Sequence, residues 1–169
     1  MRMELPSRKR QRLIGYDYST PNYYFVTICT HDKKHILWNK PPTHSPDYVG
    51  ADAHIGPRHQ LSSYGSCVDK YIKTIPGIDK YVVMPNHIHM IIAISSDTDG
   101  PMWASAPTQS LSQLIKSFKI LVTKELGQRI FQRSFHDHII RCEDDYLRIW
   151  EYVDTNPLTW KSDCFYTEE

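Results

Sequence analysis

The stretch Tyr81-Val82-Val83-Met84-Pro85-Asn86-His87-Ile88-His89-Met90-Ile91-Ile92-Ala93-Ile94 predicts a β-hairpin at the centre of the fold. β-Branched and apolar residues lie on both sides of a Pro-Asn turn dipeptide. Because side chains alternate between the two faces of a strand, His87 and His89 project to one face and Ile88 to the other. Two imidazoles on one face of a buried strand are a natural pair of metal ligands, although hydrogen-bonded core histidines would give the same pattern.

Outside this hairpin, the sequence predicts two further strands and three helices. Runs of β-branched and aromatic residues indicate the strands, and apolar residues that recur every three to four positions indicate the helices. A capping box of Ser110 and Gln113 marks the start of the second helix, and Gly127 is its expected C-cap. The predicted strands are 23–30 and 135–141, and the predicted helices are 68–75, 110–126 and 143–156.

This order of elements predicts an α+β fold. Helices gathered mainly on one face of an antiparallel sheet are the economical packing for it, and the ferredoxin-like (RRM-like) architecture has this form. With 169 residues, the chain is long enough for one domain with a proper core. We expect a single domain over residues 1–169, with a basic N-terminal segment at 1–21 and an irregular excursion loop at 39–58.

The composition excludes several kinds of protein. The four cysteines are far apart and form no C-x-x-C pair, so they fit neither the usual zinc-finger spacing nor a disulfide framework. Neither a signal peptide nor an apolar run long enough to cross a bilayer is evident, so we expect a cytoplasmic protein with no membrane partner. The net charge of +1 does not indicate a nucleic-acid partner. Local clusters of basic residues in the N-terminal segment and the second helix nevertheless suit phosphate binding.

The last predicted helix carries a tyrosine and a potential metal ligand one turn apart. Tyr152 flanks the apolar stripe of this helix, and Asn156 follows at i+4. Pro157 ends the helix there, which leaves the Asn156 side-chain carbonyl free to point outward. An aromatic residue beside an apolar stripe is most often a packing residue, so these positions alone do not establish a site. Tyr146 is the alternative nucleophile, but its i+4 neighbour is Trp150, which cannot ligate a metal.

Two other sets of histidines compete for the role of metal ligands. His136 and His138 also project to one face of a predicted strand, and geometry alone does not decide between this pair and the hairpin pair. A third set lies in or beside the excursion loop, where its spacing fits no ligand pattern, and we interpret its members as loop residues. These are His44, His54 and His59.

Four segments, taken together, resemble one family. The segment 84–89, Met-Pro-Asn-His-Ile-His, resembles the His-hydrophobic-His motif of the single-tyrosine transposases. The segments 131–141 and 151–157 resemble the REP-associated tyrosine transposase branch, the second of them through its Tyr-x-x-x-Asn-Pro pattern, and 24–30 also fits. The segments cover most of the chain in order, so the set is more specific than any one of its members.

The resemblance implies a metal-dependent endonuclease and strand transferase for single-stranded DNA. His87 and His89 would be metal ligands, Asn156 the third ligand, and Tyr152 the nucleophile that forms a 5′-phosphotyrosine link and releases a 3′-hydroxyl. The family implies Mg²⁺ or Mn²⁺, although paired imidazoles equally suit Zn²⁺. The chemistry agrees, because a cation neutralises charge on phosphate oxygens, and a phenol with a pKa of about 10 must lose its proton to attack.

The expected partner is single-stranded or stem–loop DNA, near hairpins such as REP elements, which would associate the protein with the nucleoid. The resemblance leaves open whether the chain is a monomer or a homodimer, since some relatives exchange the tyrosine helix between subunits. A hairpin-binding protein that no longer cuts is the main alternative, and an unrelated zinc protein is another. The residues expected to contact DNA are Lys116, Lys119, Arg133, His138 and Arg148.

Overall fold

The protein is built on a four-stranded antiparallel sheet with the strand order β2-β3-β1-β4. The computed structural model describes residues 13, 15–39, 61–95 and 109–168. In chain order the elements are β1 (Asn22–Cys29), η1 (His31–Lys33), α1 (Ser63–Ile72), β2 (Ile78–Val83), β3 (His87–Ile94), α2 (Leu111–Leu126), β4 (His136–Ile140), α3 (Glu143–Thr155) and η2 (Asn156–Ser162). The first six strands and helices follow the βαββαβ order of a ferredoxin-like fold, to which α3 is added.

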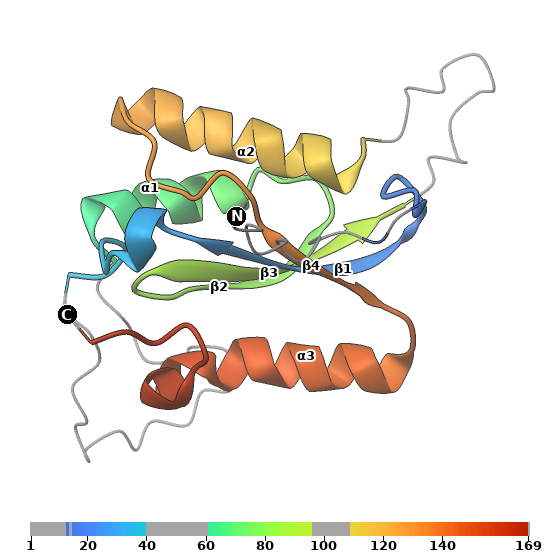
Figure 1. The fold of residues 1–169 in the computed structure, drawn as a ribbon. Coiled ribbons are helices and arrows are strands. Elements are labelled where there is room, and N and C mark those ends of the chain that lie inside the picture. The colour runs from blue at the N-terminus through green and yellow to red at the C-terminus, as the bar shows by residue number, and fades with distance from the viewer. Residues whose placement is uncertain (1–12, 14, 40–60, 96–108, 169) are drawn as a thin grey trace, which may run out of the picture.

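The helices form two layers on opposite faces of the sheet (Figure 1). Helices α1 and α2 cover one face, and α3 crosses the other. The prediction of an α+β fold with most helices on one face is therefore confirmed, and the remaining helix is the one that carries Tyr152. No helix in the described part of the chain is long and apolar enough to cross a membrane.

Most of the buried apolar side chains lie between the sheet and the α1/α2 layer. The strands contribute Ile28, Met90 and Ile92, and α2 contributes Ile115 and Phe118. On the α3 face, the apolar cluster is much smaller, with Ile91, Ile140, Ile149 and Val153 as its buried members. The hydrophobic free energy of folding therefore comes mainly from the α1/α2 face.

Local sequence signals account for the helix ends. In α2, Ser110 and Gln113 form the predicted capping box, and Gly127 ends the helix in the left-handed region at φ 69°. Helix α1 begins earlier than predicted, because Ser62 caps it by accepting a hydrogen bond from the Gly65 amide at 3.0 Å. Gly65 also lets the helix pack closely, since a Cβ there would lie 2.0 Å from the Leu37 carbonyl oxygen.

The C-terminal region differs from the prediction in one respect. Helix α3 ends at Thr155 with Asn156 as its C-cap, as expected, but the chain continues as the 3₁₀-helix η2 with Pro157 near its start. The Asn156 side chain does not point outward, because the residue has no exposed surface. The continued turn brings the segment 163–167 back against the sheet. Much of the predicted segments 1–21 and 39–58, with His44, His54 and His59, lies outside the described residues.

Candidate metal and nucleophile site

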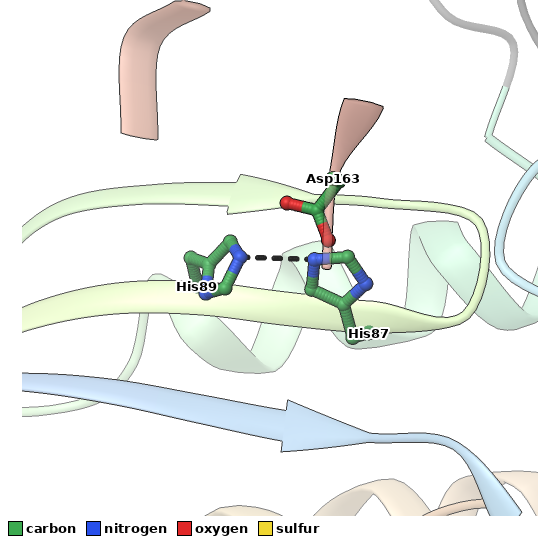
Figure 2. A group of neighbouring side chains, drawn as sticks. All are labelled: His87, His89 and Asp163. Atoms are coloured by element: carbon green, nitrogen blue, oxygen red, sulfur yellow. Dashed lines mark hydrogen bonds between the residues drawn. The ribbon is translucent and has the colours of Figure 1, made fainter. Parts of the chain in front are cut away.

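The two histidines of the hairpin face each other beneath the α3 layer. His87 opens β3 and His89 follows two positions later, so both side chains lie on the face opposite the main core. Their Nε2 atoms are 2.9 Å apart, and both residues are almost completely buried. Figure 2 shows the two rings converging, with the Asp163 carboxylate beside them.

Neighbouring side chains fix the orientation of both imidazoles. The Asn86 amide nitrogen donates to the Phe165 carbonyl oxygen at 3.0 Å, so its amide oxygen faces His87 Nδ1 at 2.8 Å and must accept. His87 therefore carries its proton on Nδ1 and presents a lone pair on Nε2. The 2.9 Å contact then requires His89 to carry its proton on Nε2, with His89 Nδ1 accepting from the Thr27 hydroxyl at 2.8 Å.

This arrangement places one hydrogen between the two Nε2 atoms, where a cation would bind. The hydrogen can move to His89 Nδ1, because the Thr27 hydroxyl can accept as well as donate. Both Nε2 lone pairs would then be available to a metal, each ring being held through its Nδ1 by a polar side chain. Such contacts are the usual way in which histidine ligands are oriented.

Burial keeps both imidazoles neutral at ordinary pH. It lowers the pKa of His87 to about 4, although the nearby Asp163 carboxylate acts in the opposite direction. Burial also lowers the pKa of His89 well below its ordinary value, and the neighbouring His87 adds to this effect. Neutral imidazole is the form that ligates metals, so the pair is ready to bind a cation over a wide pH range.

The tyrosine of α3 reaches the histidine pair from the helix that packs over this face of the sheet. The Tyr152 hydroxyl lies 3.2 Å from His89 Nε2 and donates a hydrogen bond to Asp163 Oδ2 at 2.7 Å. Burial, together with the adjacent Asp163 carboxylate, raises the pKa of this phenol well above its ordinary value. Tyr152 and the histidine pair thus meet within a single chain.

Asp163, which the sequence analysis did not single out, completes the cluster. Ligand atoms of His87, His89 and Asp163 all lie within 4.8 Å of one another. The Asn156 amide nitrogen donates to Asp163 Oδ2 at 2.6 Å, whereas the Asn156 amide oxygen is buried without a hydrogen-bond partner. Two imidazole nitrogens and a carboxylate form a donor set that fits a divalent cation such as Mn²⁺ or Mg²⁺, and the Asn156 amide lies next to it through its contact with Asp163.

Nothing in the local sequence marked Asp163 as part of this cluster. It belongs to a polar tail with no periodic pattern, and only the η2 turn after Pro157 brings it to the histidines. The Asn86 and Thr27 contacts were missed for the same reason, although Asn86 directly precedes His87. The other histidine pair, His136 and His138, does not form such a three-residue group among the described residues, although His138 contacts the Asp145 carboxylate.

The residues predicted to contact DNA lie in different parts of the molecule. His138 and Arg148 are on the α3 side, and both bind the Asp145 carboxylate, at 2.7 and 2.6 Å. Lys119 lies on α2 and donates to the Gln132 and Ser134 carbonyl oxygens, at 2.9 and 3.0 Å, so it also holds the loop before β4. The two remaining predicted contacts, Lys116 and Arg133, are exposed. Their roles in DNA binding stay predictions.

These features define a class of protein: a ferredoxin-like α+β domain in which a buried His-x-His pair faces a tyrosine on an added C-terminal helix. The chain matches no protein-family model. It is 30% identical over 183 aligned residues to an uncharacterized protein of Haemophilus influenzae, covering 95% of this chain and 94% of that protein. The chain belongs to the same family as this Haemophilus influenzae protein.

A solved structure has the same fold. It is the structure of a REP-associated tyrosine transposase bound to a REP hairpin, which superposes with a TM-score of 0.55 over 90% of this chain and 74% of that chain. The two sequences are 19% identical. The chain therefore shares the fold of this transposase.

Proposed function

We propose that this protein is a metal-dependent endonuclease and strand transferase for single-stranded DNA, with Tyr152 as its nucleophile. The observation that carries the proposal is the meeting of the Tyr152 hydroxyl with His89 Nε2 at 3.2 Å, beside a buried donor set that fits a divalent cation. A transposase whose structure was solved with a REP hairpin has the same fold, which supports DNA as the substrate.

The cation would be held by His87, His89 and the amide oxygen of Asn156, with the Asp163 carboxylate within reach as a further oxygen donor. Two observations support this assignment: the Asn156 side chain contacts Asp163, and its amide oxygen is buried without a hydrogen-bond partner, which costs free energy unless another group binds it. Mn²⁺ or Mg²⁺, when bound, would neutralise charge on the non-bridging oxygens of the scissile phosphate. The protein holds this position by the fixed orientation of both imidazoles.

Tyr152 would attack the phosphorus atom, and the bond from phosphorus to the 3′-oxygen would break. The products are a 5′-phosphotyrosine link and a 3′-hydroxyl, which takes up a proton as it leaves. The phenol proton has an acceptor in place, since the hydroxyl already donates to Asp163 Oδ2 at 2.7 Å. Attack by a 3′-hydroxyl on the phosphotyrosine reverses the step and joins strands.

Single-stranded or stem–loop DNA is the proposed partner, and such a substrate would associate the protein with the nucleoid in the cytoplasm. A monomer is the proposed working unit. The supporting observation is that Tyr152, Asp163 and both histidines come from one chain, so the site does not require a helix exchanged between subunits.

The decisive experiment tests for a covalent adduct. Labelled stem–loop DNA with single-stranded flanks is incubated with the protein and Mn²⁺ and run on a denaturing gel. We expect a protein-linked band in the wild type, and its loss by roughly a thousandfold or more in Tyr152→Phe, because the nucleophilic oxygen is removed. Tyr146→Phe is the matched control from the same helix. Its hydroxyl binds Asp79 rather than the histidines, so its adduct should persist. An adduct that survives in Tyr152→Phe contradicts the proposal.

One observation favours a second function, that of a hairpin-binding protein that no longer cuts. Burial and the Asp163 carboxylate raise the pKa of Tyr152, which opposes formation of the phenolate. If this barrier dominates, the wild type forms no adduct with any of the divalent cations, yet binds stem–loop DNA as tightly as Tyr152→Phe does.

A further inference from the structure

A groove lies on the α3 face of the sheet, with Tyr152 among its lining residues. Its volume is about 360 Å³. Its floor is formed by paired positions of two strands, Thr27 beside His136 and Phe25 beside His138. Tyr152 of α3, Phe165 of the C-terminal segment and His89 of β3 also line it. The groove is therefore continuous with the candidate site, but it includes residues that the proposed reaction does not use.

The lining of this groove suits a flat aromatic ligand. Phe165 and His136 have ring centroids 6.3 Å apart with an angle of 50° between their planes, and Phe25 lies deeper, stacked on His89 at 5.2 Å. His138 is held at the outer edge by its 2.7 Å contact with Asp145. Phenylalanine and histidine rings are the groups on which proteins stack unpaired bases.

The size of the groove limits what can occupy it. Pockets for small ligands are typically about 300–1,000 Å³, so this groove has room for a ligand of about one nucleotide and no more. It lies between α3 and the C-terminal segment, so a base can enter only when it is unstacked and unpaired. Because Tyr152 lines the groove, a phosphate at its hydroxyl would place a neighbouring nucleoside beside the groove.

We propose that the groove lined by His136 and Phe165 binds the unpaired nucleotide adjoining the scissile phosphate, with its base stacked on the exposed His136 ring. This inference rests on the proposed function for its substrate, and it assigns His136 a role in positioning the strand. With this assignment, single-stranded DNA next to a hairpin, rather than duplex, would reach Tyr152.

The test measures binding without cleavage, in EDTA. Fluorescence polarisation compares a blunt stem–loop with the same stem–loop carrying a four-nucleotide 5′ or 3′ extension, either normal or with abasic sites. For at least one extension, we expect the normal form to bind roughly tenfold tighter than the abasic form, because each stacked base contributes on this scale. His136→Ala should lose most of this difference and bind the blunt stem–loop as the wild type does.

Two further variants keep the result interpretable. His136→Phe retains an aromatic ring and should preserve the preference for the normal extension, whereas loss of that preference overturns the stacking assignment. His31→Ala removes another exposed histidine, which pairs with Asp32 outside the groove, and should change nothing. Equal binding of normal and abasic extensions by the wild type also overturns the inference, as does an equal loss on blunt and extended DNA in His136→Ala.

The covalent-adduct experiment separates this inference from the proposed function. If the wild type forms the adduct but shows no base-dependent binding at His136, the nuclease proposal stands and the groove is not a nucleotide-binding site. If the protein forms no adduct but its base-dependent binding requires His136, the groove is supported as a nucleotide-binding site and the nuclease proposal is refuted.

Discussion

The two faces of the sheet are made from the same strands but serve different purposes. On the α1/α2 face, β3 contributes Ile88, Met90 and Ile92 to a large and closed apolar core. On the α3 face, the same strand contributes His87 and His89, which meet polar side chains and a groove. Because alternation along a strand separates the faces, one strand can supply stability on one side and a polar site on the other.

The largest effect on nicking is expected from a substitution confined to the α3 face of the sheet. His89→Ala removes one of the two imidazoles and should reduce Mn²⁺-dependent nicking of stem–loop DNA by roughly a thousandfold, since metal assistance contributes several kcal/mol to such reactions. Because His89 is itself buried, some stability is lost as well, so nicking is compared per folded molecule and urea unfolding measures the folded fraction. Nicking at an undiminished rate in this variant would refute the metal assignment.

The neighbouring residue should show the opposite behaviour. Ile88→Ala opens a cavity in the α1/α2 core, where Ile88 has no exposed surface, and should lower the free energy of unfolding by about 2–5 kcal/mol. Urea unfolding followed by circular dichroism measures this loss. Nicking per folded molecule should be unchanged under conditions where the variant is folded. A selective loss of nicking with normal stability would show that the two faces are not separable.

A smaller effect, on metal affinity, is expected from removing the Thr27 hydroxyl, which forms a hydrogen bond with His89 from the neighbouring strand β1. Thr27→Val keeps the volume of this buried side chain but removes the hydrogen-bond partner of His89 Nδ1. We expect Mn²⁺ affinity to fall by about 10- to 100-fold, as for other residues that orient metal ligands. Isothermal titration calorimetry measures it, with Thr27→Ser as the matched control that restores the hydroxyl. Equal affinities for the valine and serine variants would exclude this role.

The smallest effect is on the pH dependence of the free energy of unfolding, to which the buried histidines of the α3 face contribute and the apolar core does not. In the unfolded chain both histidines protonate near pH 6.5, whereas the folded pKa of His87 is about 4 and that of His89 is also low. Below pH 6.5 the unfolded state therefore binds more protons, and stability falls as the pH approaches 4. We expect a loss of about 1–2 kcal/mol between pH 7 and pH 6 for the metal-free protein.

Urea unfolding at several pH values in EDTA measures this dependence, and His87→Asn/His89→Gln should reduce it. Excess Mn²⁺ should raise stability at pH 7, since a ligand that binds only the folded state adds to its free energy. A steep pH dependence that persists in the double variant would locate the titrating groups elsewhere.

Much of the fold could be predicted because its signals are local. The hairpin around Pro85-Asn86, the capping box of α2 and the β-branched run of β1 each act within a few residues, and the structure contains all three elements. The start of α1 was missed because it depends on Ser62 and on the close approach of Gly65 to Leu37, a residue far away in the chain.

The site divides in the same way. The sequence by itself determined that His87 and His89 share a face, and that Tyr152 and Asn156 lie one turn apart on a helix, because strand and helix periodicity fix both facts. Only the tertiary structure decided that these pairs meet, that Asp163 returns to join them, and that the Asn156 side chain points inward. The physical reason is that these contacts depend on where α3 packs across the sheet and on the path of the chain after Pro157, which no local pattern encodes.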